Sequence, residues 1–269
     1  MDFGFSGQSV MVVGGTTGIG AAAVSTLLDM KARVTVFDWK KPDSSEAAFI
    51  HLDLRDQSSI DQCVRSLESP IAALVICAGV AGGTPGLDRV NFAGPRHLLE
   101  AILDRNLLQP GSAVGMVSSL GGIGWANQLA SLEPYLTTAS YEEATRWIEE
   151  HPDRQTYIWT KQAVCAYVAS KAFDLAKRGI RINAILPGPT DTPLAQANAD
   201  GWLGFGKEFR DAVGLAVSTP EQQALPLLYL CSPAASYLNG QNIITDGGFF
   251  SSSITGRFDS PGVAALLAT

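Results

Sequence analysis

Short runs of apolar, mostly β-branched residues alternate along the chain with longer segments that have helical periodicity. This alternation is typical of βαβ units, in which helices cover both faces of a parallel sheet. No internal repeat, low-complexity tract or Pro/Ser-rich linker divides the 269 residues. We therefore expect one α/β domain over residues 1–269, built on a doubly wound, seven-stranded parallel sheet. The seven expected strands are residues 8–13, 33–37, 48–52, 71–77, 112–117, 180–186 and 241–245.

Three segments interrupt this alternation. Residues 125–152 form a polar, acidic stretch with helical spacing, which predicts a helical insertion. Residues 189–213 contain Trp202 and Phe205 among glycines. That composition suits a mobile lid with an apolar inner face, and ordinary aromatic packing in a loop would explain it equally well. The tail, residues 249–269, shows no clear pattern.

Charge and hydropathy exclude several classes of partner. The chain carries 19 basic and 26 acidic residues, for a net charge of -7 and a pI of about 4.9. No stretch is rich in Lys and Arg, so we expect no nucleic-acid partner. The N-terminus, residues 1–8, lacks a positively charged leader region, and the longest apolar run, residues 71–78, is too short to span a bilayer. We expect a soluble, cytoplasmic protein with no membrane partner.

The four cysteines and three histidines show no metal-binding spacing. The cysteines lie far apart within apolar segments and form no C-x-x-C pair, which predicts small, buried, reduced thiols. The histidines form no H-x-x-x-H or comparable cluster, so no zinc site is expected.

A glycine-rich turn, Gly14-Gly15-Thr16-Thr17-Gly18-Ile19-Gly20, joins the first expected strand to a helical pattern at residues 21–30. Glycines allow the backbone to turn sharply and approach a pyrophosphate, whose charge the amides at the helix N-terminus neutralise. A tight strand-to-helix connection would look similar. The strand before the turn and the amphipathic helix after it favour dinucleotide binding.

Asp38 ends the second expected strand. A carboxylate there can hydrogen-bond the ribose hydroxyls and repel a 2′-phosphate, which favours NAD over NADP. Lys40 or Lys41 could turn toward such a phosphate, although solvated lysines are the default at a strand end. Asp53, followed by Leu54, is placed to accept a hydrogen bond from the adenine amino group or, equally, to cap the next helix.

Tyr157 and Lys161 are spaced one helical turn apart, and residues 162–177 continue the helix without Gly or Pro. On one helix face, a fixed positive charge beside the phenol favours the phenolate and suits the tyrosine to acid/base chemistry. The isolated pair would also fit an ordinary helix surface.

Other polar or small residues follow expected strands. Ala78 and Gly79 would let a loop pass close to a cofactor. Asn91 lies among apolar neighbours, and a buried amide must find partners. Ser118 and Ser119 follow the fifth expected strand, where serines are usually turn residues.

Taken together, these motifs from Gly7 to Gly248 resemble the short-chain dehydrogenase/reductase family, which has a Rossmann fold. The resemblance implies a catalytic tetrad of Asn91, Ser119, Tyr157 and Lys161, with Ser119 preferred to Ser118 because it fits the family's Ser-x-x-Gly register. Segments 232–237, 240–241 and 246–248 are similar to the family's closing region. The implied cofactor-binding residues are Gly14, Thr17, Gly18, Ile19, Gly20, Asp38, Asp53, Leu54, Ala78, Gly79, Tyr157, Lys161, Pro187, Gly188, Thr190 and Thr192.

Two departures narrow the resemblance. Cys77 stands where most members have an asparagine, and residues 125–152 are inserted between Ser119 and the catalytic helix that begins near Tyr157. Both features resemble the 3-alpha-hydroxysteroid dehydrogenase/carbonyl reductase branch. There the insertion covers a surface that most members use for a tetramer interface, so a homodimer is expected before a homotetramer.

The resemblance implies NAD-dependent hydride transfer between a secondary alcohol and a ketone. Tyr157 would exchange the proton, Ser119 would orient the substrate oxygen, Lys161 would hold the ribose and stabilise the phenolate, and Asn91 would fix a relay water. The apolar lid favours a bulky neutral small-molecule substrate such as a hydroxysteroid, terpene or aryl carbinol. Three alternatives are disfavoured. The complete tetrad argues against a non-catalytic dinucleotide sensor, and Lys161 argues against a lyase or dehalogenase on the same scaffold. The short Tyr-to-Lys spacing argues against an enoyl reductase.

Overall fold

The computed structural model describes residues 3–42 and 46–268, and all statements below concern this part of the chain. Residues 1–2, 43–45 and 269 belong to the predicted domain, and residue 269 also to the predicted tail. These positions lie outside the described residues.

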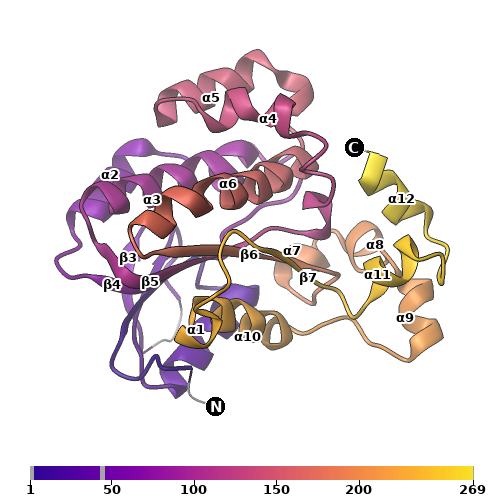
Figure 1. Ribbon diagram of the computed structural model, residues 1–269, viewed down its shortest axis with the longest axis horizontal. Helices are drawn as coiled ribbons and strands as arrows, with labels where there is room; N and C mark the ends of the chain where they lie inside the picture. Colours follow the sequence, from indigo (N-terminus) through magenta and orange to yellow (C-terminus); the bar gives the residue numbers. More distant parts are fainter. Residues whose placement is uncertain (1–2, 43–45, 269) are drawn as a thin grey trace.

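Seven parallel strands form one sheet in the order β3-β2-β1-β4-β5-β6-β7, which confirms the predicted fold class (Figure 1). Their bounds are β1 Ser9–Val13, β2 Arg33–Asp38, β3 Ala48–His51, β4 Ile71–Ile76, β5 Leu108–Val117, β6 Arg181–Pro187 and β7 Asn242–Thr245. The strand order reverses between β1 and β4. In doubly wound sheets, ligands bind beyond the carboxyl ends of the strands at such a switch point.

Helices cover both faces of the sheet, so the strands bury both sets of side chains. Figure 1 shows α1 (Gly18–Asp29) and α10 (Pro220–Cys231) on one face. The opposite face carries α2 (Gln57–Arg65), α3 (Gly94–Asp104) and α6 (Tyr157–Lys177). Side chains of β1 alternate between the two hydrophobic clusters as the pleat requires, with Val10 and Val12 in one and Met11 and Val13 in the other.

Two elements begin three or more residues earlier than predicted, whereas the other strand bounds agree within one residue. β5 begins at Leu108 rather than at Ser112, because Leu108 pairs with Ile71 before an irregularity shifts the register. The intervening Gln109-Pro110-Gly111 has no apolar alternation, and Gly111 has a φ of 95°. Helix α1 begins at Gly18 rather than at residue 21, so its first turn lies inside the glycine-rich loop.

The predicted insertion forms two helices, α4 (Leu129–Leu136) and α5 (Tyr141–Glu150), which lie outside α3 and α6 (Figure 1). Ser140 caps α5 by accepting a hydrogen bond from the Glu143 amide at 3.1 Å. Their inner faces join the main core through buried side chains that include Leu132, Tyr135 and Ile148.

The predicted lid contains three short helices, α7 (Pro193–Gln196), α8 (Ala199–Trp202) and α9 (Lys207–Val213). The tail, for which no structure was predicted, forms α11 (Phe249–Ile254) and α12 (Pro261–Ala268). Figure 1 shows these five helices grouped at one end of the sheet. Phe209, Phe249 and Val263 are buried together in a separate hydrophobic cluster, so the lid and the tail pack on each other.

No helix among the described residues is long and apolar enough to cross a membrane. The described part of the chain also contains no group of three or more His, Cys, Asp or Glu side chains able to hold a metal ion. All four cysteines are free, three of them buried and Cys77 partly exposed.

Candidate active site

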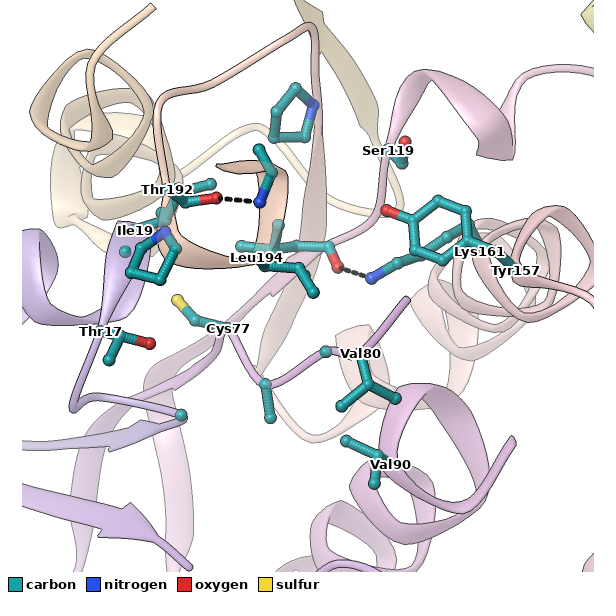
Figure 2. Close-up of a pocket in the computed structure, with 18 of the residues that line it drawn as sticks. Thr17, Ile19, Cys77, Val80, Val90, Ser119, Tyr157, Lys161, Thr192 and Leu194 are labelled. Carbon is teal, nitrogen blue, oxygen red and sulfur yellow. Dashed lines mark hydrogen bonds between the residues drawn. The ribbon is translucent and has the colours of Figure 1, made fainter. Parts of the chain in front are cut away.

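A cavity of about 640 Å³ opens across the carboxyl ends of the strands, between the sheet and the lid. Of the residues predicted to bind cofactor or to act in catalysis, Gly20 and Asn91 do not line it, and all the others do. One cavity therefore brings together residues from both ends of the chain. Figure 2 shows Thr17 and Ile19 on one side of it and Ser119, Tyr157 and Lys161 on the other.

The glycine-rich loop is shaped for close backbone approach. Gly14 has a φ of 75°, and a Cβ there would lie 2.5 Å from the Ala78 nitrogen. A Cβ on Gly20 would collide with the Gly14 carbonyl oxygen, so Gly20 acts by packing under the loop rather than by facing the cavity. Thr17 is the N-cap of α1, but its side chain makes no capping hydrogen bond within the described structure. The first amides of α1 are thus available to an anionic group.

Asp38 is buried at the end of β2, with its side chain at the cavity wall. Its Oδ2 accepts hydrogen bonds from the Thr16 amide at 3.1 Å and from the Thr16 hydroxyl at 2.7 Å. Its Oδ1 has a long contact of 3.4 Å with the Lys40 amide. The glycine-rich loop therefore holds the carboxylate in place, and Oδ1 retains the capacity to accept from a ribose hydroxyl.

Asp53 is held by its neighbour Arg55, which sequence reasoning missed. The guanidinium donates to both carboxylate oxygens, at 2.9 and 2.8 Å, and this pairing holds the pKa of Asp53 below its usual value. The alternative that Asp53 caps the next helix is wrong, because Asp56 is the N-cap of α2 and accepts from the Ser58 amide at 3.0 Å. Asp53, Leu54 and Arg55 all line the cavity.

Tyr157 is the first residue of α6, where the Thr156 side chain caps the helix by accepting from the Trp159 amide at 3.1 Å. The Ser119 side chain lies beside the Tyr157 ring, since both groups would be within 4 Å of a Cβ on Gly121. Burial raises the pKa of Tyr157 to about 12, against the smaller lowering effect of Ser119. Ser118 instead donates to the Lys161 carbonyl at 2.8 Å and is buried away from the phenol. The structure thus places Ser119, and not Ser118, beside Tyr157.

Lys161 is buried one turn along α6, with its ammonium 5.6 Å from the centre of the Tyr157 ring. Nζ donates to the Val117 carbonyl at 3.1 Å, the bond marked in Figure 2, and two further protons remain for other acceptors. Burial lowers the pKa of Lys161 to about 8. The side chain is therefore still mostly protonated at neutral pH.

Asn91 lies behind the cavity in a π-helical turn, Arg89–Ala93, which leads into α3. Its amide bridges two segments that do line the cavity. Oδ1 accepts from the Val80 amide at 2.8 Å, and Nδ2 donates to the Val80 carbonyl at 3.1 Å and to the Thr160 hydroxyl at 3.2 Å. The expected partners of this buried amide are thus found, and they tie the loop after β4 to α6.

The loop after β4 carries the departure at Cys77. This thiol lines the cavity together with Ala78 and Gly79, and burial raises its pKa to about 12. A Cβ on Gly79 would lie 3.4 Å from the Lys161 ammonium, so the small residue leaves the lysine accessible. A neutral thiol supplies no strong hydrogen bond in place of the missing amide.

The loop after β6 supplies the far wall of the cofactor region. The Gly188 amide donates to the Thr245 carbonyl at 3.1 Å, and the Thr190 hydroxyl donates to the Gly188 carbonyl at 2.9 Å. Thr192 caps α7 by accepting from the Ala195 amide at 3.1 Å. Pro187, Gly188, Thr190 and Thr192 all line the cavity.

The lid and the tail close the other side of the cavity with apolar groups. The Trp202 ring lies 4.8 Å from the Tyr157 ring, and Phe205 packs edge-on against Phe249 at 5.4 Å. Leu266 of α12 also lines the cavity and was not predicted, because the tail shows no pattern that would indicate contact with the lid. Other apolar lining residues that were not predicted include Val13, Phe37, Trp39, Val80 and Val90.

Several known proteins are similar to this chain over most of its length. A family model described as enoyl-(acyl carrier protein) reductase matches residues 13–250. Coniferyl-alcohol dehydrogenase from Pseudomonas sp. strain HR199 is 29% identical over 255 residues, covering 92% of this chain and 98% of the relative. The 3-alpha-hydroxysteroid dehydrogenase/carbonyl reductase of Comamonas testosteroni is 30% identical over 252 residues, covering 90% and 96%, respectively.

A solved structure has the same fold. The crystal structure of 3-alpha-hydroxysteroid dehydrogenase from Pseudomonas sp. B-0831, complexed with NADH, matches with a TM-score of 0.74 at 25% sequence identity. The match covers 94% of this chain and the whole of that one.

Proposed function

Since the chain belongs to the short-chain dehydrogenase/reductase family and is an oxidoreductase acting on alcohol-like substrates, we propose that it uses NAD and interconverts a secondary alcohol and a ketone. The observation that carries the proposal is the placement of Ser119, Tyr157 and Lys161 around one end of a cavity whose other end is the glycine-rich loop. Hydride transfer is the chemistry that the bound dinucleotide supplies.

The residues of the chain handle the proton and orient the substrate. Tyr157 gives a proton to the carbonyl oxygen during reduction and takes it from the hydroxyl during oxidation. Ser119, beside the phenol, holds the same substrate oxygen. The Lys161 ammonium stabilises the phenolate as charge develops, and its two remaining N–H groups suit ribose hydroxyls. Asn91 keeps the Val80 loop and α6 in register behind these groups.

The adenosine end supports NAD rather than NADP. Asp38 is fixed by Thr16, and an extra phosphate on the ribose would meet its charge directly. The Arg55 guanidinium, which also lines the cavity, already has both carboxylate oxygens of Asp53 as partners. Lys40 also lines the cavity and is exposed, so it is the remaining residue of the predicted pair that could approach a phosphate.

The substrate end supports a bulky apolar alcohol. Trp202, Phe205, Leu194 and Leu266 line it, and none of them carries a charge. Two of the relatives are named for coniferyl alcohol, a primary alcohol that carries an aryl ring, and for 3-alpha-hydroxysteroids, which are secondary alcohols. Both names support a bulky carbon frame, and the second also supports a secondary alcohol. We propose a hydroxysteroid, terpene or aryl carbinol as the substrate class.

The proposal is tested by titrating the purified protein with NADH and NADPH while following nicotinamide fluorescence. The preferred oxidised cofactor is then supplied with a panel of hydroxysteroids, cyclic terpenols and aryl carbinols. We expect tighter binding of NADH and turnover of one class. Preference for NADPH would overturn the choice of cofactor. Binding of NADH without turnover of any carbinol would favour a dinucleotide sensor over an enzyme.

The insertion also bears on assembly. Helices α4 and α5 cover the outer side of α3 and α6 (Figure 1), which removes that face from contact with a second copy. We propose a homodimer, with a homotetramer as the alternative. Light scattering coupled to size-exclusion chromatography distinguishes two copies from four.

A further inference from the structure

A side chain of the insertion hydrogen-bonds the wall of the cofactor cavity from the outside. Tyr141, the first residue of α5, donates a hydrogen bond from its hydroxyl to the Leu54 carbonyl at 3.0 Å, and this bond is buried. Leu54 belongs to the loop between β3 and α2, and its side chain lines the adenosine end of the cavity beside Asp53 and Arg55. A residue of the insertion thus holds a peptide group of the cavity wall.

The Leu54 peptide has little freedom on its outer side. A Cβ on Gly94, at the start of α3, would collide with the Leu54 carbonyl oxygen, so helix and loop are in direct backbone contact. The Tyr141 ring also packs against His97 of α3, with 5.7 Å between ring centres. His97 in turn pairs with Asp61 of α2 at 2.9 Å. Tyr141 therefore closes a set of contacts that fixes where the Leu54 wall stands relative to α2 and α3.

Aromatic contacts hold the insertion against the rest of the domain, so it can hold the Leu54 wall in place. Trp147 of α5 stacks on Trp159 of α6 with 6° between ring planes, and Tyr135 of α4 packs against Phe92 at 5.1 Å. These partners are neighbours in sequence of Tyr157 and Asn91. The same element is therefore seated against the catalytic helix while it reaches the adenosine end through Tyr141.

We infer that Tyr141 is a positioning residue for the adenosine end of the cofactor, acting through the Leu54 carbonyl. The inference rests on the proposed binding of a nicotinamide dinucleotide in this cavity. A hydroxyl that holds the wall from outside shapes the adenosine pocket without touching the ligand. Its loss should weaken the part of the binding that comes from adenosine and leave the nicotinamide end unchanged.

The test compares Tyr141→Phe with a matched control, Tyr135→Phe. Both remove one buried hydroxyl from the insertion, but the Tyr135 hydroxyl has no hydrogen-bond partner within the described structure. Three probes are titrated by fluorescence or competition: NADH, ADP-ribose, and reduced nicotinamide mononucleotide, which lacks adenosine. Phenylalanine keeps the ring packing, and the unfolding temperature of each variant is measured to confirm the fold.

For Tyr141→Phe we expect the Kd of NADH and of ADP-ribose to rise about 3- to 10-fold, the range set by one hydrogen bond. The Kd of the mononucleotide and kcat at saturating NADH should stay within about twofold. Tyr135→Phe should leave all three affinities unchanged. An unchanged NADH affinity in Tyr141→Phe, or an equal loss for NADH and the mononucleotide, would overturn the inference. Failure of the wild-type protein to bind NADH or NADPH would instead overturn the proposed function.

Discussion

In the cofactor half of the cavity, groups at strand ends hold one another by hydrogen bonds, whereas the substrate half is held by packing between short helices. Asp38 is fixed by two bonds from Thr16, and Gly188 by one to Thr245. Across the cavity, Trp202 rests on Tyr157 and Phe205 on Phe249 through ring contacts. The sheet places the groups of the cofactor half, whereas packing between the lid and the tail places those of the substrate half.

This difference has consequences for how each half tolerates change. Hydrogen bonds are directional, so the cofactor half accepts one shape and loses function sharply when a partner is removed. Apolar packing is non-directional and tolerates exchanges of similar volume, so the substrate half can change its preference by small steps. Substitutions should therefore have large, ligand-specific effects in the first half and graded effects in the second.

The largest effect is expected at Tyr157, where the two halves meet. Tyr157→Phe removes the proton donor and acceptor but keeps the ring, so kcat should fall about 10²- to 10⁴-fold while the Kd of NADH stays within about twofold. Steady-state kinetics and fluorescence titration measure the two quantities. Tyr237→Phe, at a fully exposed position outside the cavity, is the control. Turnover within tenfold of wild type would remove Tyr157 from proton transfer.

In the cofactor half, the largest effect on the preference between NADH and NADPH is expected at Asp38. Asp38→Ala removes a charged acceptor worth about 1.5–3 kcal/mol, so the preference for NADH over NADPH should fall about 10- to 150-fold. The affinity ratio comes from titration with both cofactors. Asp174→Ala, at an exposed carboxylate outside the cavity, is the control and should leave the preference unchanged. An undiminished ratio in Asp38→Ala would contradict selection by this carboxylate.

The dependence on pH should differ between the two directions of reaction. The pKa of Tyr157 is raised to about 12, so the phenol is the dominant form at neutral pH and the phenolate becomes more abundant as pH rises. Alcohol oxidation needs the phenolate and should accelerate from pH 6 to 8, by at most about tenfold per pH unit. Ketone reduction needs the phenol and should stay nearly constant over that range.

Lys161 sets the pH above which the rate of alcohol oxidation should stop rising. Its pKa is lowered to about 8, so the ammonium that stabilises the phenolate is lost as pH rises through that value. The gain in oxidation rate should therefore level off above pH 8. Initial rates of both reactions across pH 6–10 measure this, and identical profiles in the two directions would contradict the assigned role of Tyr157.

The smallest effect is expected in the substrate half. Leu266→Ala removes part of an apolar wall, and since Leu266 is only partly buried, kcat/KM for the preferred substrate should fall by no more than about tenfold. The Kd of NADH should not change. Leu267→Ala is the matched control, because Leu267 is exposed and does not line the cavity. An equal effect of both substitutions would show that α12 contributes no specific wall.

Motifs with short, local spacing could be predicted well. The glycines at positions 14 to 20 and the Tyr157–Lys161 pair depend on the backbone of one turn or one helix. The structure brings Gly14 and Gly18 to the same cavity as Tyr157 and Lys161, while Gly20 packs under the loop. The resemblance favoured Ser119 over Ser118 through the family's Ser-x-x-Gly register. The contacts agree, because Ser118 donates to the Lys161 carbonyl whereas Ser119 lies beside Tyr157. Arg55 escaped prediction because its pairing with Asp53 depends on how one loop turns.

The sequence by itself determined the alternation of strands and helices, the sheet that follows from it, and the residue types at the strand ends, because periodicity and turn chemistry are local properties. Only the tertiary structure decided that Tyr141 supports Leu54, that Asn91 joins Val80 to α6, and that Leu266 faces the cavity. These contacts join segments far apart in the chain. Which of them meet is decided by packing of whole elements, and no local pattern encodes that.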